Sequence, residues 1–144
     1  MKIKTILLLF TSFFLAALSS SALPCSLGGR QLTVQFDPGS AELGISNAKS
    51  LAEWFIQWRD GLGMDRITVV APALKSSPAL ADKRMANVAR ILDGINTRSA
   101  AIVYEIEVRD DGFSDTRYLD SLDATVEPAC LRLGTCCRQY KQVD

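Results

Sequence analysis

The stretch LADKRMANVARIL, from Leu80 to Leu92, predicts an amphipathic helix around which the rest of the fold can be arranged. Ser77 is placed to cap this helix, and Pro78 can occupy its first position, where a missing N–H is not needed. Arg84 lies beside the apolar stripe rather than opposite it, near the helix N-terminus. Apolar residues recur every three or four positions and predict one buried stripe, formed by Ala81, Met85, Val88, Leu92 and Ile95.

The segments on either side of this helix alternate between strand and helix patterns. Residues 46–61 are predicted to be helical, with Leu51, Phe55 and Trp58 on one stripe. Alternating or β-branched apolar runs predict strands at 31–37, 66–71, 101–109 and 122–130. Between these elements we expect a loop at 72–78 and a helical turn near 116–122. The order β-α-β-α-β-(α)-β, with half-polar strands and one-stripe helices, predicts an α+β two-layer sandwich. Its mixed sheet should carry both helices on one face.

The N-terminal residues have the composition of a secretory signal peptide. Lys2 and Lys4 form a positive start, an apolar run at 6–18 follows, and small residues lead to Ala22. This run is too short to span a bilayer, and no later run is long enough, so we expect a chain that does not span the membrane. Cleavage near Ala22, removing residues 1–22, would leave 23–144 as a single exported domain in the periplasm, with secretion as the alternative.

Charge and composition limit the classes of function. The leader carries two of the 16 basic residues and none of the 16 acidic ones, so the mature chain has a net charge of −2 and no basic patch for nucleic acid. There is no histidine, nucleophile motif or phosphate-binding loop, so we expect neither catalysis nor a cofactor. Asp110 and Asp111 are expected in a solvated turn. Trp54 and Trp58, one helical turn apart, are expected in the core rather than on a ligand platform.

Four cysteines lie in the predicted mature chain: Cys25, Cys130, Cys136 and Cys137. In an exported protein an even number of cysteines predicts disulfides, and four cysteines allow three pairings. We expect Cys130 to pair with Cys136 or Cys137 and the other of these two to reach Cys25. Each bridge would add about 2–4 kcal/mol. No metal site is expected, because the chain has no Cys-x-x-Cys pair and no histidine.

Three motifs in order resemble the OmpA-like domain family, the peptidoglycan-associating module of Gram-negative cell envelopes. VQFDPGSAEL (34–43) is similar to the opening strand and turn of the family, and ITVVAPA (67–73) falls at its second strand. LADKRMANVARIL is similar to its Leu-Ser-x-x-Arg-Ala-x-x-Val-x-x-x-Leu helix, with Arg84 on the arginine of the family. The resemblance covers 31–95. It implies a non-catalytic binding domain whose arginine and aspartate hold the diaminopimelate of the peptidoglycan stem peptide.

The chain departs from this pattern at the aspartate. In the family this aspartate ends a Gly-x-Thr-Asp run after the second strand. At the corresponding positions, 71–74, this chain has Ala-Pro-Ala-Leu. Residues 67–81 contain no aspartate or glutamate. Arginine can hold a carboxylate through two hydrogen bonds, whereas an aspartate would hold the ammonium. We therefore expect Arg84, Lys75, Ser76 and Ser77, with the free N–H groups at the helix start, to bind one carboxylate. The alternative is a surface arginine whose stem covers apolar residues.

Two functions are compatible with these features. The first is an exported binding module that associates with peptidoglycan through Arg84, so that Arg84→Glu would abolish retention on purified peptidoglycan. The second is a periplasmic accessory, immunity-type or inhibitor protein on the same fold that no longer binds the wall. Such a protein would contact another envelope protein through its polar sheet face or its cysteine-rich tail.

Overall fold

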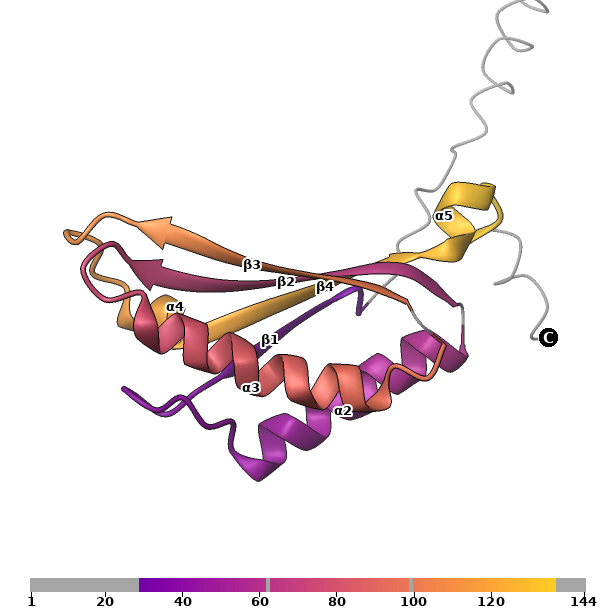
Figure 1. Cartoon of the computed structure of the whole chain (residues 1–144). Coiled ribbons are helices and arrows are strands. Elements are labelled where there is room, and N and C mark those ends of the chain that lie inside the picture. The colour runs from indigo at the N-terminus through magenta and orange to yellow at the C-terminus, as the bar shows by residue number, and fades with distance from the viewer. Residues whose placement is uncertain (1–28, 62, 99, 137–144) are drawn as a thin grey trace, which may run out of the picture.

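The computed structural model describes residues 29–61, 63–98 and 100–136 (Figure 1). The predicted leader, Cys25 and Cys137 lie outside these residues. The predicted order of elements and the α+β class are confirmed. The elements are β1 (Gln31–Gln35), α2 (Ile45–Asp60), β2 (Met64–Leu74), α3 (Ala79–Ile95), β3 (Ala101–Arg109), α4 (Thr116–Leu119), β4 (Ser121–Pro128) and α5 (Ala129–Leu133).

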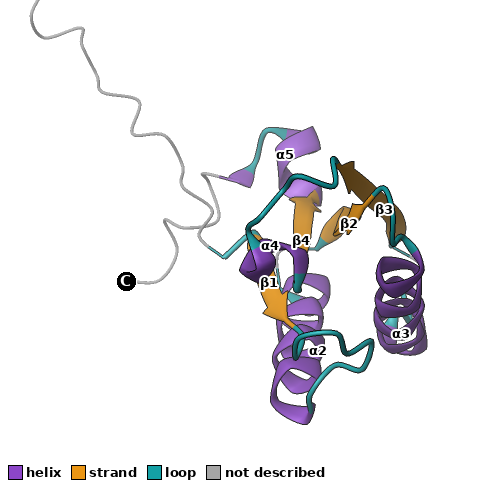
Figure 2. Ribbon diagram, turned by 90° about the vertical axis from the view of Figure 1, so that its left-hand side faces the viewer, coloured by secondary structure: helices purple, strands orange, loops and turns teal. Residues whose placement is uncertain are grey.

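The four strands form one mixed sheet in the order β1-β4-β2-β3. Strand β4 runs antiparallel to both of its neighbours, whereas β2 and β3 are parallel. Helices α2 and α3 both cover the same face of the sheet, as Figures 1 and 2 show. This is the predicted two-layer sandwich, which buries the apolar stripe of each helix against one face of the sheet. Within the described part of the chain, no helix is both long and apolar enough to cross a bilayer.

The core lies between the sheet and the two helices. Side chains of alternate strand residues point to the same face, so each strand contributes every second residue to this layer. The apolar stripe predicted for α3 is buried at four of its five positions and partly buried at Ile95. The fully buried side chains at the centre of the core include Leu51, Phe55, Ile67, Val69, Val88, Leu92, Leu122 and Val126.

Both tryptophans of α2 belong to this core, as expected from the sequence. Trp54 is 9% exposed and Trp58 is 7% exposed. Their indole N–H groups donate to the same acceptor, the carbonyl oxygen of Gly29, over 2.7 and 3.0 Å. A buried indole N–H usually requires such a partner. The two side chains therefore fix Gly29, two residues before β1, against α2.

Strand β2 is longer than predicted and continues into the expected loop as far as Leu74. Pro72 is buried within it and lies in register with Glu107 of β3. Pairing between β2 and β4 ends at Val70, so Pro72 lies where β2 is paired on one side only. A proline is tolerated at such a position, because its missing N–H is not needed on the unpaired side. The predicted loop is therefore wrong at its first three residues.

Helix α5 follows β4 directly and was not predicted from the sequence. Its Cys130 forms a disulfide with Cys136, with a Cα–Cα distance of 4.7 Å. Gly134, between the two cysteines, has a φ of 63°, a left-handed conformation that glycine adopts without steric strain. This bridge is one of the two short pairings expected from the sequence.

Candidate functional site

A small pocket lies at the end of the sandwich where α3 begins, on the left in Figure 1. Its volume is about 210 Å³. Three segments that are distant in sequence form its walls: the end of β2, the first turns of α3, and α4 with the residue before β4. The lining residues are Pro72, Ala73, Leu74, Ser77, Leu80, Ala81, Arg84, Thr116, Leu119 and Asp120.

Arg84 reaches this pocket from the second turn of α3, and its donors are directed at internal acceptors. Its Nε donates to the carbonyl of Ser40, and its Nη1 donates to the carbonyl of Leu119, each over 2.7 Å. Its Nη2 donates to Asp120 Oδ1 over 2.7 Å and lies 3.5 Å from the carbonyl oxygen of Asp37. The guanidinium thereby joins the β1–α2 loop and the α4–β4 turn to α3.

The burial of Arg84 contradicts the expectation of a surface arginine, because the residue is only 2% exposed. Its guanidinium carbon also lies 4.8 Å from the ring centroid of Phe36, close enough for a cation–π interaction. A guanidinium has five N–H groups, and those of Arg84 are largely occupied by internal acceptors. Arg84 therefore has no free pair of N–H groups with which to hold a carboxylate.

Asp120 places an acid beside Arg84, although residues 71–74 lack one. Its side chain is 19% exposed and lines the pocket. Oδ1 accepts the hydrogen bond from Arg84, and within the described part of the chain Oδ2 has no hydrogen-bond partner. Sequence reasoning missed Asp120, since it lies far along the chain from Arg84 in a segment whose pattern was ambiguous. No local signal relates the two residues.

The other predicted ligand residues are only partly brought together. Ser77 lines the pocket, but Lys75 and Ser76 do not. Lys75 Nζ pairs with Asp110 over 2.5 Å, and the backbone N–H of Ser76 donates to Asp111 Oδ1 over 2.9 Å. The structure therefore brings Ser77 and Arg84 together at the pocket but not Lys75 and Ser76. The two acids, predicted as a solvated turn, are exposed but also hold the β2–α3 loop.

The start of α3 leaves backbone donors uncapped next to the pocket. Pro78 has helical dihedral angles, and no side chain caps the helix at this residue, so the predicted cap by Ser77 is not seen. The N–H of Asp82 donates to the carbonyl of Pro78 over 3.1 Å, which leaves the preceding N–H groups without intrahelical acceptors. Leu80 and Ala81 both line the pocket. This end of α3 therefore presents partial positive charge where the pocket opens.

The wall formed by α4 is held by a separate set of polar contacts. Asp115 caps α4 by accepting from the N–H of Tyr118 over 3.0 Å. The Tyr118 hydroxyl donates to Glu107, which also pairs with Arg109 over 2.6 Å. The guanidinium of Arg109 lies 5.5 Å from the ring of Phe113 and 5.3 Å from that of Tyr118. These contacts fix α4 on β3. They thereby position Asp120, which follows α4 and lines the pocket.

The pocket has one carboxylate side chain, that of Asp120, and no cysteine among its lining residues. Across residues 29–61, 63–98 and 100–136, no three cysteine, aspartate or glutamate side chains converge in a way that could hold a metal ion. The polar groups of the pocket are one buried ion pair, two hydroxyl groups and backbone N–H groups. Such a set can bind both charges of a small zwitterion through hydrogen bonds.

No protein-family model matches the chain, and no curated protein sequence matches it. Among solved structures, the OmpA-like domain of FopA1 from Francisella tularensis aligns with a TM-score of 0.50 and 20% identity, covering 72% of this chain and 80% of that chain. A putative MotB-like protein from Desulfovibrio vulgaris aligns with a TM-score of 0.48 and 17% identity, covering 69% and 76%. The FopA1 comparison shows that the chain has an OmpA-like fold, as its sequence motifs predicted.

Proposed function

We propose that this chain is an exported, non-catalytic OmpA-like binding module that associates with peptidoglycan. In this proposal the pocket at the start of α3 holds the zwitterionic end of a stem peptide. The observation that supports it most directly is the pair of buried Arg84 and partly exposed Asp120 in the wall of a pocket on this fold. A cavity lined mainly by apolar residues, with a few convergent polar groups, is typical of a small-ligand site.

The two charges of the ligand would be held by different groups from those expected at first. In the described part of the chain Asp120 Oδ2 has no hydrogen-bond partner and could accept from an ammonium, while Arg84 holds the carboxylate of Asp120 in place. The ligand carboxylate would bind the uncapped N–H groups at the start of α3, with the Ser77 hydroxyl as a further donor. Arg84 is then a positioning residue for the acid rather than the group that binds the anion.

Export to the periplasm is part of the proposal. The positive start, apolar run and small residues of 1–22 support it, as does the Cys130–Cys136 bridge, since disulfides persist in oxidising compartments. Peptidoglycan would then be accessible to the mature domain.

A variant that fills the pocket and leaves the Arg84–Asp120 pair unchanged tests whether the pocket binds peptidoglycan. Leu80 is partly buried and lines the pocket, so Leu80→Trp should block it and abolish retention of the mature protein on purified peptidoglycan. Ile56→Trp is the matched control, because Ile56 is exposed on α2 and should tolerate the same enlargement. Free diaminopimelate should displace the unaltered protein. Circular dichroism would establish that both variants fold.

Retention of the folded Leu80→Trp protein at the level of the control would contradict the pocket as the binding site. Absence of retention for the unaltered protein would instead favour the alternative function. That alternative is a periplasmic protein-binding factor on the same fold, acting through its polar sheet face or its cysteine-rich tail.

A further inference from the structure

The outer edge of β3 is unpaired within the described part of the chain. Strand β3 is last in the sheet order, and its nine residues pair with β2 in unbroken register from Ala101 to Arg109. Natural edge strands are commonly protected by lysine, proline, bulges or short length. This strand contains no lysine or proline and is about 30 Å long at about 3.3 Å per residue. The edge can therefore accept the backbone of an added strand.

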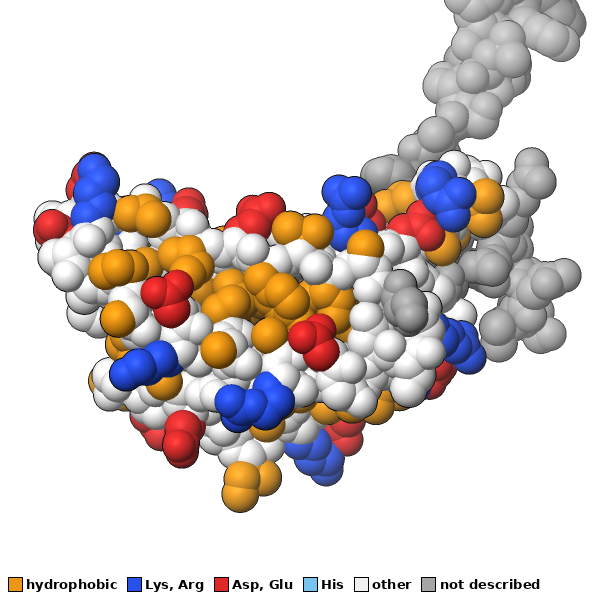
Figure 3. Space-filling model, in the orientation of Figure 1, with side chains coloured by type: hydrophobic (Ala, Val, Ile, Leu, Met, Phe, Trp, Pro, Cys, Tyr) orange, Lys and Arg blue, Asp and Glu red, His pale blue; other side chains and the backbone are white. Residues whose placement is uncertain are grey.

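An apolar strip runs along this edge on the side of the helices. Ile102, Tyr104 and Ile106 of β3 are only partly buried against the core, and Val108 is 54% exposed. Figure 3 shows apolar side chains gathered on this face between β3 and α3. Side chains alternate across a strand, so every second residue of an added strand would lie against this strip. Covering it would remove apolar surface from water.

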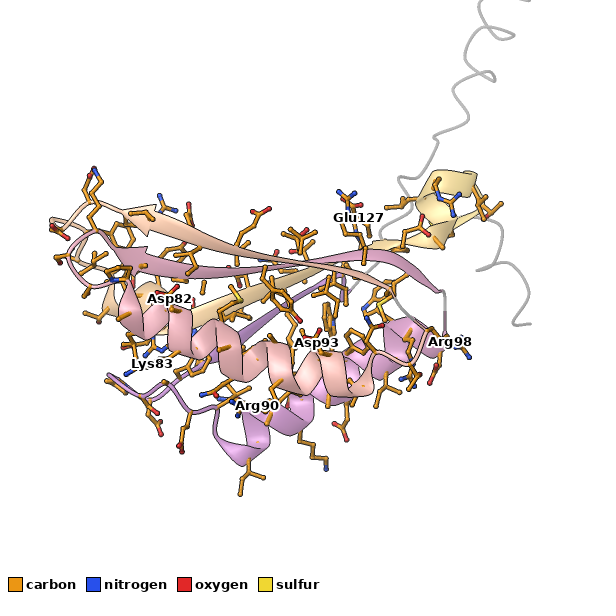
Figure 4. All side chains as sticks on the ribbon, in the orientation of Figure 1. Asp82, Lys83, Arg90, Asp93, Arg98 and Glu127 are labelled. Carbon is orange, nitrogen blue, oxygen red and sulfur yellow. A yellow bond between two sulfur atoms is a disulfide. The ribbon has the colours of Figure 1, made fainter. Side chains whose placement is uncertain are left out.

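Acidic side chains flank the strip without compensating cations. Figure 4 shows Asp82 and Asp93 on the part of α3 that faces β3, with Lys83 and Arg90 on the part turned away. Asp93 accepts from the hydroxyl of Tyr104 over 2.9 Å, which holds its carboxylate at the strip. Glu105 is exposed on the opposite face of β3. In the described part of the chain none of these three acids forms an ion pair.

We propose that the β3 edge is a docking site for an extended segment of a partner protein in which apolar residues alternate with lysine or arginine. The segment would add a fifth strand next to β3, with its apolar residues on the strip and its basic residues on the face of Glu105. Asp82 and Asp93 lie beside the strip on the helix side, where they would add a longer-range attraction for a cationic segment. This surface is separate from the pocket and does not depend on the function proposed for it.

A second copy of the chain fits this edge poorly. Two β3 strands paired antiparallel about Glu105 would place that residue opposite its own copy, and pairing about Ile106 would place Glu105 opposite Glu107. Like charges directly opposite each other destabilise a strand pair. The charge on the strand therefore favours a basic partner over self-association.

A synthetic peptide tests the proposal. A labelled peptide of the length of β3, alternating valine and lysine, should raise its fluorescence anisotropy on titration with the mature protein and should slow hydrogen exchange at β3 amides. The same peptide with glutamate in place of lysine should not bind. The double variant Asp82→Asn with Glu105→Gln should weaken binding about fivefold. Glu53→Gln on α2 is the matched control and should leave binding unchanged.

Four results would overturn the proposal. One is the absence of binding by the lysine peptide, and another is equal binding of the glutamate peptide. The third is equal binding of a peptide methylated at every backbone nitrogen, since neither edge of such a peptide can donate the N–H hydrogen bonds of a strand pair. A sedimentation experiment that shows a dimer, lost on Val108→Lys, would assign the edge to a second copy of this chain and would likewise overturn it.

Discussion

Arg84 carries a charge that is almost excluded from water, and its ion-pair partner in the described part of the chain is Asp120. A charge buried in this way is tolerated only when it is paired and its remaining donors are satisfied. Carbonyl oxygens from the β1–α2 loop and from the last residue of α4 satisfy further N–H donors of Arg84. The residue therefore combines two roles, since it stabilises the domain and it fixes the acid of the candidate site.

Arg84→Met should lower the free energy of unfolding by about 3–5 kcal/mol, because it leaves the Asp120 carboxylate without its buried partner. The methionine keeps an unbranched apolar side chain, so the loss reports mainly on the guanidinium, including its contact with the Phe36 ring. Urea denaturation followed by circular dichroism measures the change. Arg90→Met is the control, because Arg90 is exposed on the same helix and its replacement should change stability by under about 0.5 kcal/mol. Equal stability of the two variants would contradict this role of Arg84.

The elements differ in how accurately the sequence predicts their bounds. Strand β3 was predicted with its observed bounds, because an alternation of apolar and polar residues along nine positions is a strong local signal. Strand β2 was predicted too short, since Pro72 is normally a sign of a strand end and its tolerance depends on where β4 stops pairing. The Arg84–Asp120 pair depends on tertiary structure in the same way. Local patterns therefore predicted the scaffold and Arg84, but not the partner of Arg84.

The second predicted disulfide, Cys25–Cys137, stays a prediction, and the described segments that flank its two cysteines in sequence adjoin each other. Arg30 follows Cys25 by a few residues, and its carbonyl accepts from the N–H of Val126 over 2.9 Å. Arg30 also lines the same hollow as Leu131 of α5. Mass spectrometry of an unreduced digest should find the peptides of Cys25 and Cys137 joined. Alkylation of Cys25 in the unreduced, folded protein would contradict the prediction.

The whole molecule has several carboxylates that are stabilised in their charged form. The Arg59 guanidinium holds the pKa of Asp60 below its usual value through a side-chain hydrogen bond, and Arg132 lowers the pKa of Asp65 in the same way. The pKa of Asp111 is lowered chiefly by the backbone N–H of Ser76. Each group titrates at a lower pH in the folded state than in the unfolded chain, so each favours folding when it is ionised.

Stability should therefore be constant from neutral pH down to about pH 5 and should fall as the pH drops below about 4, through the lowered pKa values of the folded state. The chain has no histidine, the residue type that most often titrates between about pH 5 and pH 7, so no histidine changes its charge in that range. Thermal unfolding midpoints measured against pH would show this profile. Asp65→Asn should reduce the acid-dependent loss, and an unchanged profile in that variant would contradict the contribution of its pair with Arg132.

The two-layer arrangement leaves different surfaces for different tasks. The pocket lies at one end, where α3, β2 and α4 meet, whereas the open edge runs along the side of the sheet. Both depend on the rigid core between the sheet and the helices. A ligand at the end and a strand at the side could therefore be bound at the same time without competing for residues.

Both indole N–H groups donate to the carbonyl of Gly29, so the emission of the two tryptophans depends on how Gly29 is held against α2. Any tension transmitted from residues before Gly29 would reach the indoles of Trp54 and Trp58 first, since both donate to that single oxygen. These are the two tryptophans of the chain, so their emission would respond when the N-terminal connection is pulled away. The two indoles thus provide an intrinsic fluorescence reporter for the detachment of Gly29 from α2.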